Sequence, residues 1–183
     1  MFKEQSAQRV PRSVLFFGRF SPSKSPDVLV DAIQILEAQG VKCTASFFGS
    51  AGAHNASYRS TVQARAYALE NVRFFEGVPH ADAPRIYSAH QIYVDLAPSG
   101  MYDKTIFEAA ACGCLVVAAS HDYARIADPR LSFDGSAEDL AAKLKQLLEL
   151  PEAEQHSLIL RLKKLADEHS LPSLVRTLST LLV

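Results

Sequence analysis

The sequence predicts an α/β fold, in which a Rossmann-like, mostly parallel sheet of about six strands is flanked by helices and followed by a helical tail. Three observations lead to this prediction. Between residues 13 and 134, short apolar runs alternate with longer segments of helical periodicity. The short runs are apolar at almost every position, which is typical of parallel strands buried on both faces. After residue 134 the helical patterns dominate.

The elements follow in order along the chain. The predicted strands lie at residues 14–17, 43–48, 72–75, 92–96 and 115–119, with a weaker sixth at 131–133. A first helix is expected at 26–39, because Pro26 suits the first helical position and Gly40 suits the position after the end. Further helices are expected at residues 57–69, 81–90 and 104–112. The tail is predicted to form helices at 137–150, 152–168 and 172–183.

Length and composition fit one domain. The chain has 183 residues, of which 48% are hydrophobic, enough for one sizeable core. We divide residues 1–183 into a leader (1–12), an α/β core (13–134) and a helical tail (135–183).

Charge and cysteine content narrow the function classes. Nineteen Lys and Arg against twenty Asp and Glu give a net charge of −1, so no global positive field favours nucleic acid or an anionic membrane. No apolar run approaches the roughly 20 residues of a membrane-spanning helix. Three cysteines do not make a disulfide framework, and the six histidines lack metal-ligand spacing. We therefore expect a cytoplasmic protein with no metal and no membrane association.

A ligand crevice is expected where the winding of the sheet reverses. In the strand order 3-2-1-4-5-6 this point lies between strands one and four, beyond their carboxyl ends. The loops that follow these strands, residues 18–24 and 97–104, would face each other there. A flavodoxin-like order would instead put the reversal between strands one and three.

These two loops carry the candidate binding residues. Gly18 permits close approach to the backbone, and Arg19 and Lys24 can stabilise the negative charge of a diphosphate. Asp103 precedes a helix whose first-turn N–H groups can hold an anion. Glu108 lies one turn further on and can accept hydrogen bonds from a sugar diol. This arrangement suits a nucleotide.

Three stretches, taken together, resemble a known family. They are F-F-G-R-F-S-P-S-K-S-P-D-V-L-V-D-A, N-V-R-F-F-E-G-V-P-H-A-D-A-P-R-I-Y-S-A and P-S-G-M-Y-D-K-T-I-F-E-A-A-A-C-G-C-L-V-V-A. In sequence and spacing they resemble the carboxyl-terminal, donor-binding domain of retaining family-4 glycosyltransferases, which have the GT-B fold. The resemblance extends from about residue 13 to the last helices.

The resemblance implies a role for each matching position. Arg19 and Lys24 match the basic pair that binds the donor diphosphate, and Glu108 matches the second glutamate of the Glu-x7-Glu motif, which holds the ribose. The backbone of Lys104, Thr105 and Ile106 matches the segment beside the phosphates, and that of Val78 matches a contact to the nucleobase. By position alone, His80 lies near Val78 and could border the base, while Tyr58 and Arg59 could border the pocket but fit a helix surface better.

The sequence departs from the family in two respects. Gly100 stands where the first glutamate of the motif contacts the donor sugar, and Asp103 or Lys104 would have to replace that contact. GT-B enzymes also have an amino-terminal domain that binds the acceptor, whereas twelve residues precede residue 13 here. We therefore expect a second domain or a partner chain to supply the acceptor site.

The predicted function is the donor-binding half of a retaining glycosyltransferase that uses a nucleoside-diphosphate sugar, such as a UDP- or GDP-sugar, and no other cofactor. The isolated chain is expected to transfer sugar poorly, because the wall that positions the acceptor is missing. The alternatives are a non-catalytic nucleotide-sugar-binding or partner-docking module and a GT-B epimerase. The sequence leaves the base, the sugar and the acceptor open.

Overall fold

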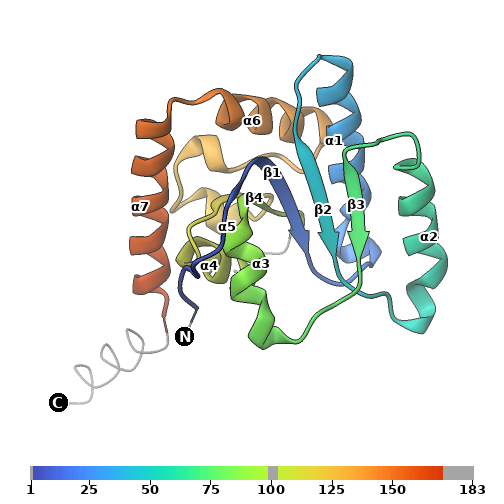
Figure 1. The fold of residues 1–183 in the computed structure, drawn as a ribbon, viewed down its shortest axis with the longest axis horizontal. Helices are drawn as coiled ribbons and strands as arrows, with labels where there is room; N and C mark the ends of the chain where they lie inside the picture. Colours follow the sequence, from blue (N-terminus) through green and yellow to red (C-terminus); the bar gives the residue numbers. More distant parts are fainter. Residues whose placement is uncertain (1, 99–102, 171–183) are drawn as a thin grey trace.

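A computed structural model describes residues 2–98 and 103–170 (Figure 1). Its sheet has five strands in the order β3-β2-β1-β4-β5, and all four strand pairs are parallel. The strands are β1 (Val10–Phe17), β2 (Thr44–Phe48), β3 (Val72–Phe75), β4 (His90–Asp95) and β5 (Leu115–Ala118). The predicted fold class and the reversal between strands one and four are therefore confirmed.

The predicted sixth strand is reduced to one contact. Ser132 forms an isolated parallel bridge with Ala118 of β5, which puts this segment on the outer side of the sheet. A short 3-10 helix, Pro129–Leu131, comes directly before Ser132 and occupies the residues that would have extended the pairing. The position of the sixth element agrees with the prediction, but its length is that of a single bridge.

Seven α-helices are present in the described residues. They are α1 (Pro26–Ala38), α2 (Ala56–Arg65), α3 (Ala83–Ala89), α4 (Lys104–Ala111), α5 (His121–Ala124), α6 (Ala137–Glu149) and α7 (Glu152–Glu168). Two differ from the prediction, because α2 ends at Arg65 and α5 has no counterpart in it. The predicted helix 172–183 lies outside the described residues. None of the described helices is long and apolar enough to cross a membrane.

The helices form two layers on the sheet (Figure 1). Helix α1 packs against α2 and α6, and α4 packs against α3 and α7. Between these layers all four residues of β5 are inaccessible to solvent and the last four of β4 are buried, whereas the edge strand β3 alternates between half-buried and exposed residues. The double cover explains why β4 and β5 are apolar at successive positions rather than at alternate ones.

The segment that precedes the sheet is fastened to the fold. Arg9 donates from Nη1 to the carbonyl oxygen of Gly113 (2.7 Å), from Nη2 to that of Cys112 (3.0 Å) and from Nε to that of Ser88 (3.3 Å). Gly113 has a φ of +83°, and a Cβ there would lie 2.8 Å from Arg9 Nη2. Arg9 therefore binds the carboxyl-terminal end of α4.

Candidate functional site

The carboxyl edge of the sheet is closely packed where β1 and β2 end. The Gly18 amide donates to the Phe48 carbonyl (3.0 Å), and the Phe20 amide donates to the Ser50 carbonyl (3.1 Å). A Cβ on Gly49 would lie 1.8 Å from the Gly18 oxygen, so position 49 admits no side chain without movement of the backbone. These contacts hold the start of the loop after β1 against the end of β2.

The two predicted ligand loops meet at an ion pair. Lys24, in a 3-10 turn after β1 (Pro22–Lys24), donates from Nζ to Oδ2 of Asp103, the residue before α4. Asp103 also accepts a hydrogen bond from the Thr105 amide through Oδ1 (3.2 Å), which is the geometry of a helix cap. Burial raises the pKa of Asp103, but the hydrogen bonds from Lys24 and Thr105 and the Lys24 charge lower it overall.

The cap changes the expected anion site at the start of α4. The Thr105 amide is used by the Asp103 carboxylate, and the Ile106 amide donates to the Asp103 carbonyl (3.0 Å). The Ile106 side chain is buried in the core. Of the three predicted amides, only that of Lys104 makes no hydrogen bond with a described residue. Arg19 is exposed and forms no hydrogen bond or ion pair with a described residue either.

A buried polar network under α4 was not predicted from the sequence. Asp95, at the end of β4, is 4% exposed and accepts hydrogen bonds from the Ala97 amide (3.0 Å) and the Thr105 hydroxyl (3.3 Å). The Tyr93 hydroxyl donates to Thr105 Oγ1 (2.9 Å). Burial and then the Asp103 charge raise the pKa of Asp95, while Lys24 opposes them. The network joins the strand end to the first turn of α4.

Glu108 lies against a histidine from the neighbouring loop. Its Oε1 is 3.0 Å from Nε2 of His80, which opens the 3-10 helix His80–Asp82 after β3. The Glu108 side chain is 11% exposed and that of His80 is 60% exposed. Val78 is half-buried two residues before His80. The structure thus brings Glu108 together with the loop that carries Val78.

Tyr58 and Arg59 are engaged by other side chains. The Tyr58 hydroxyl donates to Asp27, and Arg59 makes a bidentate ion pair with Glu76 (2.7 and 2.9 Å). The Arg59 guanidinium also lies 5.2 Å from the centre of the Phe20 ring. Arg59 therefore links α2 to the loops after β1 and β3, whereas Tyr58 binds α1. Gly100, the position of the missing glutamate, lies outside the described residues.

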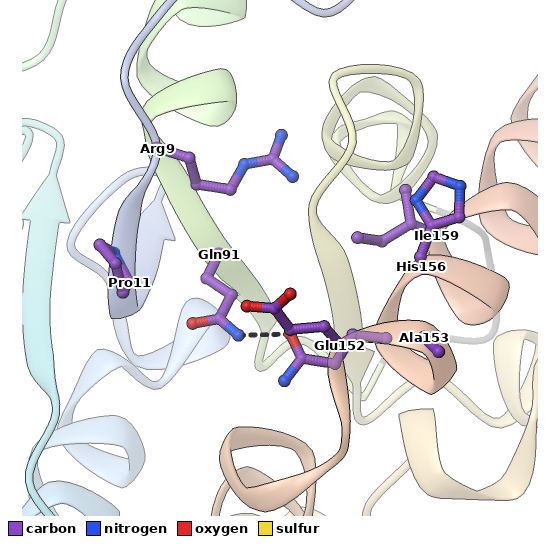
Figure 2. A pocket seen from close by; sticks show the side chains of 8 residues that line it. Arg9, Pro11, Gln91, Glu152, Ala153, His156 and Ile159 are labelled. Carbon is purple, nitrogen blue, oxygen red and sulfur yellow. Dashed lines mark hydrogen bonds between the residues drawn. The ribbon is translucent and has the colours of Figure 1, made fainter.

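Two cavities lie in different parts of the molecule, one between α4 and the end of α7 and one at the amino edge of the sheet. One of about 360 Å³ borders Lys104 and Glu108 on the α7 side. A larger one, of about 590 Å³, opens at the amino edge between the starts of β1 and β4 and the start of α7 (Figure 2). Arg9 and Gln91 line it, and Gln91 donates to Gln155 (2.7 Å). None of the predicted site residues lines the larger cavity, so its size does not make it the candidate site.

Comparison with known proteins assigns the family. The family model for group 1 glycosyl transferases matches residues 11–150. This chain belongs to the group 1 glycosyltransferases. A search of curated protein sequences found no significant match for this glycosyltransferase chain.

Solved structures share the fold. Anabaena Alr3699/HepE, solved in complex with UDP and glucose, has 20% identity and a TM-score of 0.76 over 93% of this chain and 48% of its own. The C-terminal domain of the glycosyl transferase LpcC from Francisella tularensis has 16% identity and a TM-score of 0.77, over 92% of this chain and 95% of its own.

The catalytic domain of cholesterol-alpha-glucosyltransferase from Helicobacter pylori has 21% identity and a TM-score of 0.72, over 88% of this chain and 100% of its own. The present glycosyltransferase chain has the fold of the C-terminal domain of GT-B enzymes and spans about half the length of HepE.

Proposed function

We propose that this chain binds a nucleoside-diphosphate sugar at the carboxyl edge of its sheet and acts as the donor half of a retaining glycosyltransferase. The observation that carries the proposal is the ion pair between Lys24 and Asp103, which brings the two ligand loops into contact. Arg19, exposed on the same loop as Lys24, adds a second cation. A diphosphate at this contact would meet both cations of the loop after β1, and it would take the place of the Asp103 carboxylate at Lys24.

The proposed mechanism depends on the negative charge that develops on the diphosphate during sugar transfer. When the bond between the sugar anomeric carbon and the diphosphate oxygen breaks, the electron pair stays on the diphosphate. Arg19 and Lys24 stabilise that charge, which accelerates the step because the interaction strengthens as the bond lengthens. The acceptor hydroxyl attacks the anomeric carbon from the same face and gives its proton to the departing diphosphate. Glu108 holds the ribose in place during this exchange.

A second domain belongs to the proposal. The chain spans about half of HepE, and the residues that we assign to the donor all lie within this chain. Water must be excluded and an acceptor positioned before transfer is efficient. We propose that this wall comes from an amino-terminal domain or from a partner chain. Binding of the nucleotide alone should not require it.

The test is calorimetric titration of the chain with UDP, GDP and ADP. UDP is the first probe because the structural relative HepE was solved with UDP. Arg19→Ala should weaken nucleotide binding by about 1.5 kcal/mol or more, since a charge-assisted hydrogen bond is lost. Arg161→Ala is the matched control, because Arg161 is 72% exposed on α7 and lines a different cavity. Failure of all three diphosphates to bind, or equal effects of both substitutions, would refute the proposal.

A non-catalytic binding module is the second candidate. It is favoured by Gly100, which offers no carboxylate to the donor sugar at the position where the family places one. The same titrations would succeed for such a module. Incubation of the matching nucleotide sugar with a candidate partner chain separates the two, because only an enzyme releases free nucleoside diphosphate and a glycosylated product.

A further inference from the structure

We propose that His80 is a positioning residue for the donor ribose, because it holds the Glu108 carboxylate at the crevice and is itself held by Phe2. The inference rests on the proposed function and deepens it. His80 comes from the loop after β3, Glu108 from α4 and Phe2 from the segment before β1, so three separate parts of the chain build this contact.

The hydrogen bond leaves the carboxylate able to bind a diol. His80 Nε2 meets only Oε1 of Glu108, at 3.0 Å. An ionised carboxylate offers about four acceptor positions on its two oxygens, so both ribose hydroxyls can still donate to it. The Glu108 side chain is 11% exposed, whereas that of His80 is 60% exposed. The histidine therefore reaches from the solvent side towards a carboxylate that is otherwise mostly covered.

The buried Tyr87 side chain belongs to the same cluster, since its ring packs edge to face against that of Phe2. The Tyr87 hydroxyl is fully buried and has no hydrogen-bond partner among the residues that the structure describes. Burial, and next the charge of Glu108, raise the pKa of Tyr87. Among the described side chains, His80 is the one that hydrogen-bonds the Glu108 carboxylate. Loss of His80 therefore leaves the carboxylate free to turn away from the ligand.

Phe2 fixes the imidazole from the other side. Its ring centre lies 5.0 Å from that of His80, edge to face at 62°, and 6.2 Å from that of Tyr87. Edge-to-face contacts between aromatic rings stabilise beyond the apolar area that they bury. The segment that carries Phe2 is in turn fastened by Arg9. The amino-terminal segment therefore contacts the proposed donor site through the ring of Phe2.

The experiment compares the affinity for UDP with that for 2′-deoxy-UDP. The same comparison is made for GDP and ADP with their 2′-deoxy forms. The deoxy nucleotide lacks one hydroxyl that would donate to Glu108, so the intact protein should prefer UDP by about tenfold or more. His80→Ala should bring this preference close to one. His80→Gln should restore part of it, because the glutamine amide can donate as the imidazole does. Phe2→Ala should give a smaller loss of preference.

The control is His156→Ala, since His156 lies on α7 beside the larger cavity at the amino edge (Figure 2). This variant should keep the preference for the ribonucleotide. Glu108→Gln is the reference, and adding His80→Ala to it should cause no further loss.

The outcomes separate this inference from the proposed function. If Glu108→Gln removes the preference and His80→Ala leaves it intact, the inference is wrong and the ribose site stands. Tighter binding of UDP by His80→Ala would also overturn the inference, because the histidine would then compete with the ligand. If the intact protein binds none of the diphosphates, or Glu108→Gln has no effect on the preference, the ribose site itself fails and the inference fails with it.

Discussion

Asp103 and Asp128 have the same local chemistry in two different regions of the molecule. Each accepts a hydrogen bond from the amide two residues later, at the start of a helix, and each pairs with a basic side chain. The partner of Asp128 is Arg130, two residues away, with contacts of 2.9 Å from Nε and Nη2. The partner of Asp103 is Lys24, which is 79 residues away.

The difference in partner separates a stabilising contact from an exchangeable one. Arg130 is held by its own turn and by Glu154 (3.1 Å), so the Asp128 pair can only support the outer edge of the sheet. Lys24 joins two loops, and a lysine ammonium on a flexible stem can leave a carboxylate for a phosphate. The Lys24 pair therefore joins the two loops to which the proposed function assigns the diphosphate, whereas the Arg130 contacts join one turn to α7.

The largest expected effect comes from replacing Lys24 or Arg130 with alanine, one at a time. Lys24→Ala should weaken UDP binding by about 1.5–3 kcal/mol, because a charge-assisted contact to the diphosphate is lost. Its unfolding free energy should fall by less than about 1 kcal/mol, as for other partly exposed pairs. Arg130→Ala should lower stability and leave UDP binding unchanged. Calorimetry measures UDP binding, and urea unfolding measures stability. Equal losses of UDP affinity in Lys24→Ala and Arg130→Ala would contradict the comparison.

The pH dependence of stability should identify Asp128. Hydrogen bonds from Arg130 lower the pKa of Asp128 to about 2. A pKa below that of the unfolded chain means that the ionised carboxylate stabilises the fold above about pH 4, and that this stabilisation is lost as the pH falls towards 2. Between pH 6 and pH 3, the intact protein should lose about 1 kcal/mol more than Asp128→Asn. If the urea midpoints of the intact protein and of Asp128→Asn fall equally across this range, Asp128 is not the source of the pH dependence.

The smallest expected effect sharpens the role of Asp103. Asp103→Asn keeps a good helix cap and removes one negative charge beside the proposed diphosphate. UDP binding should therefore improve, by less than about 1 kcal/mol, because Lys24 no longer has to leave a carboxylate. Asp128→Asn serves as the control and should leave UDP binding unchanged. Weaker UDP binding by Asp103→Asn would mean instead that this carboxylate contacts the donor, in place of the glutamate missing at position 100.

The sequence predicted the fold well because its signals were local. Strand runs, Pro26, Gly40 and the turn before residue 104 can each be recognised within a few residues, and the strand order followed from the fold class. The sixth strand was overestimated. Asp128 caps a 3-10 turn directly before Ser132, and this competing local structure leaves room for one bridge.

The candidate site was predictable only in part. Lys24 and Asp103 were expected to approach each other, because the reversal of the winding sets their loops face to face. The link from Asp95 to Thr105 was missed, although a lone aspartate at the end of an apolar strand was a visible signal. The contact between His80 and Glu108 depends on how α4 sits relative to the loop after β3, and no local pattern encodes that.

Helix α4 is restrained at both of its ends, by Lys24 through Asp103 at the start and by Arg9 on the last carbonyl groups. A helix of eight residues would otherwise fray readily. Because these contacts hold α4 without a ligand, binding of the proposed nucleotide need not supply the entropy cost of ordering it. The leading segment of the chain thus restrains α4 at the end farthest from the proposed phosphate contact.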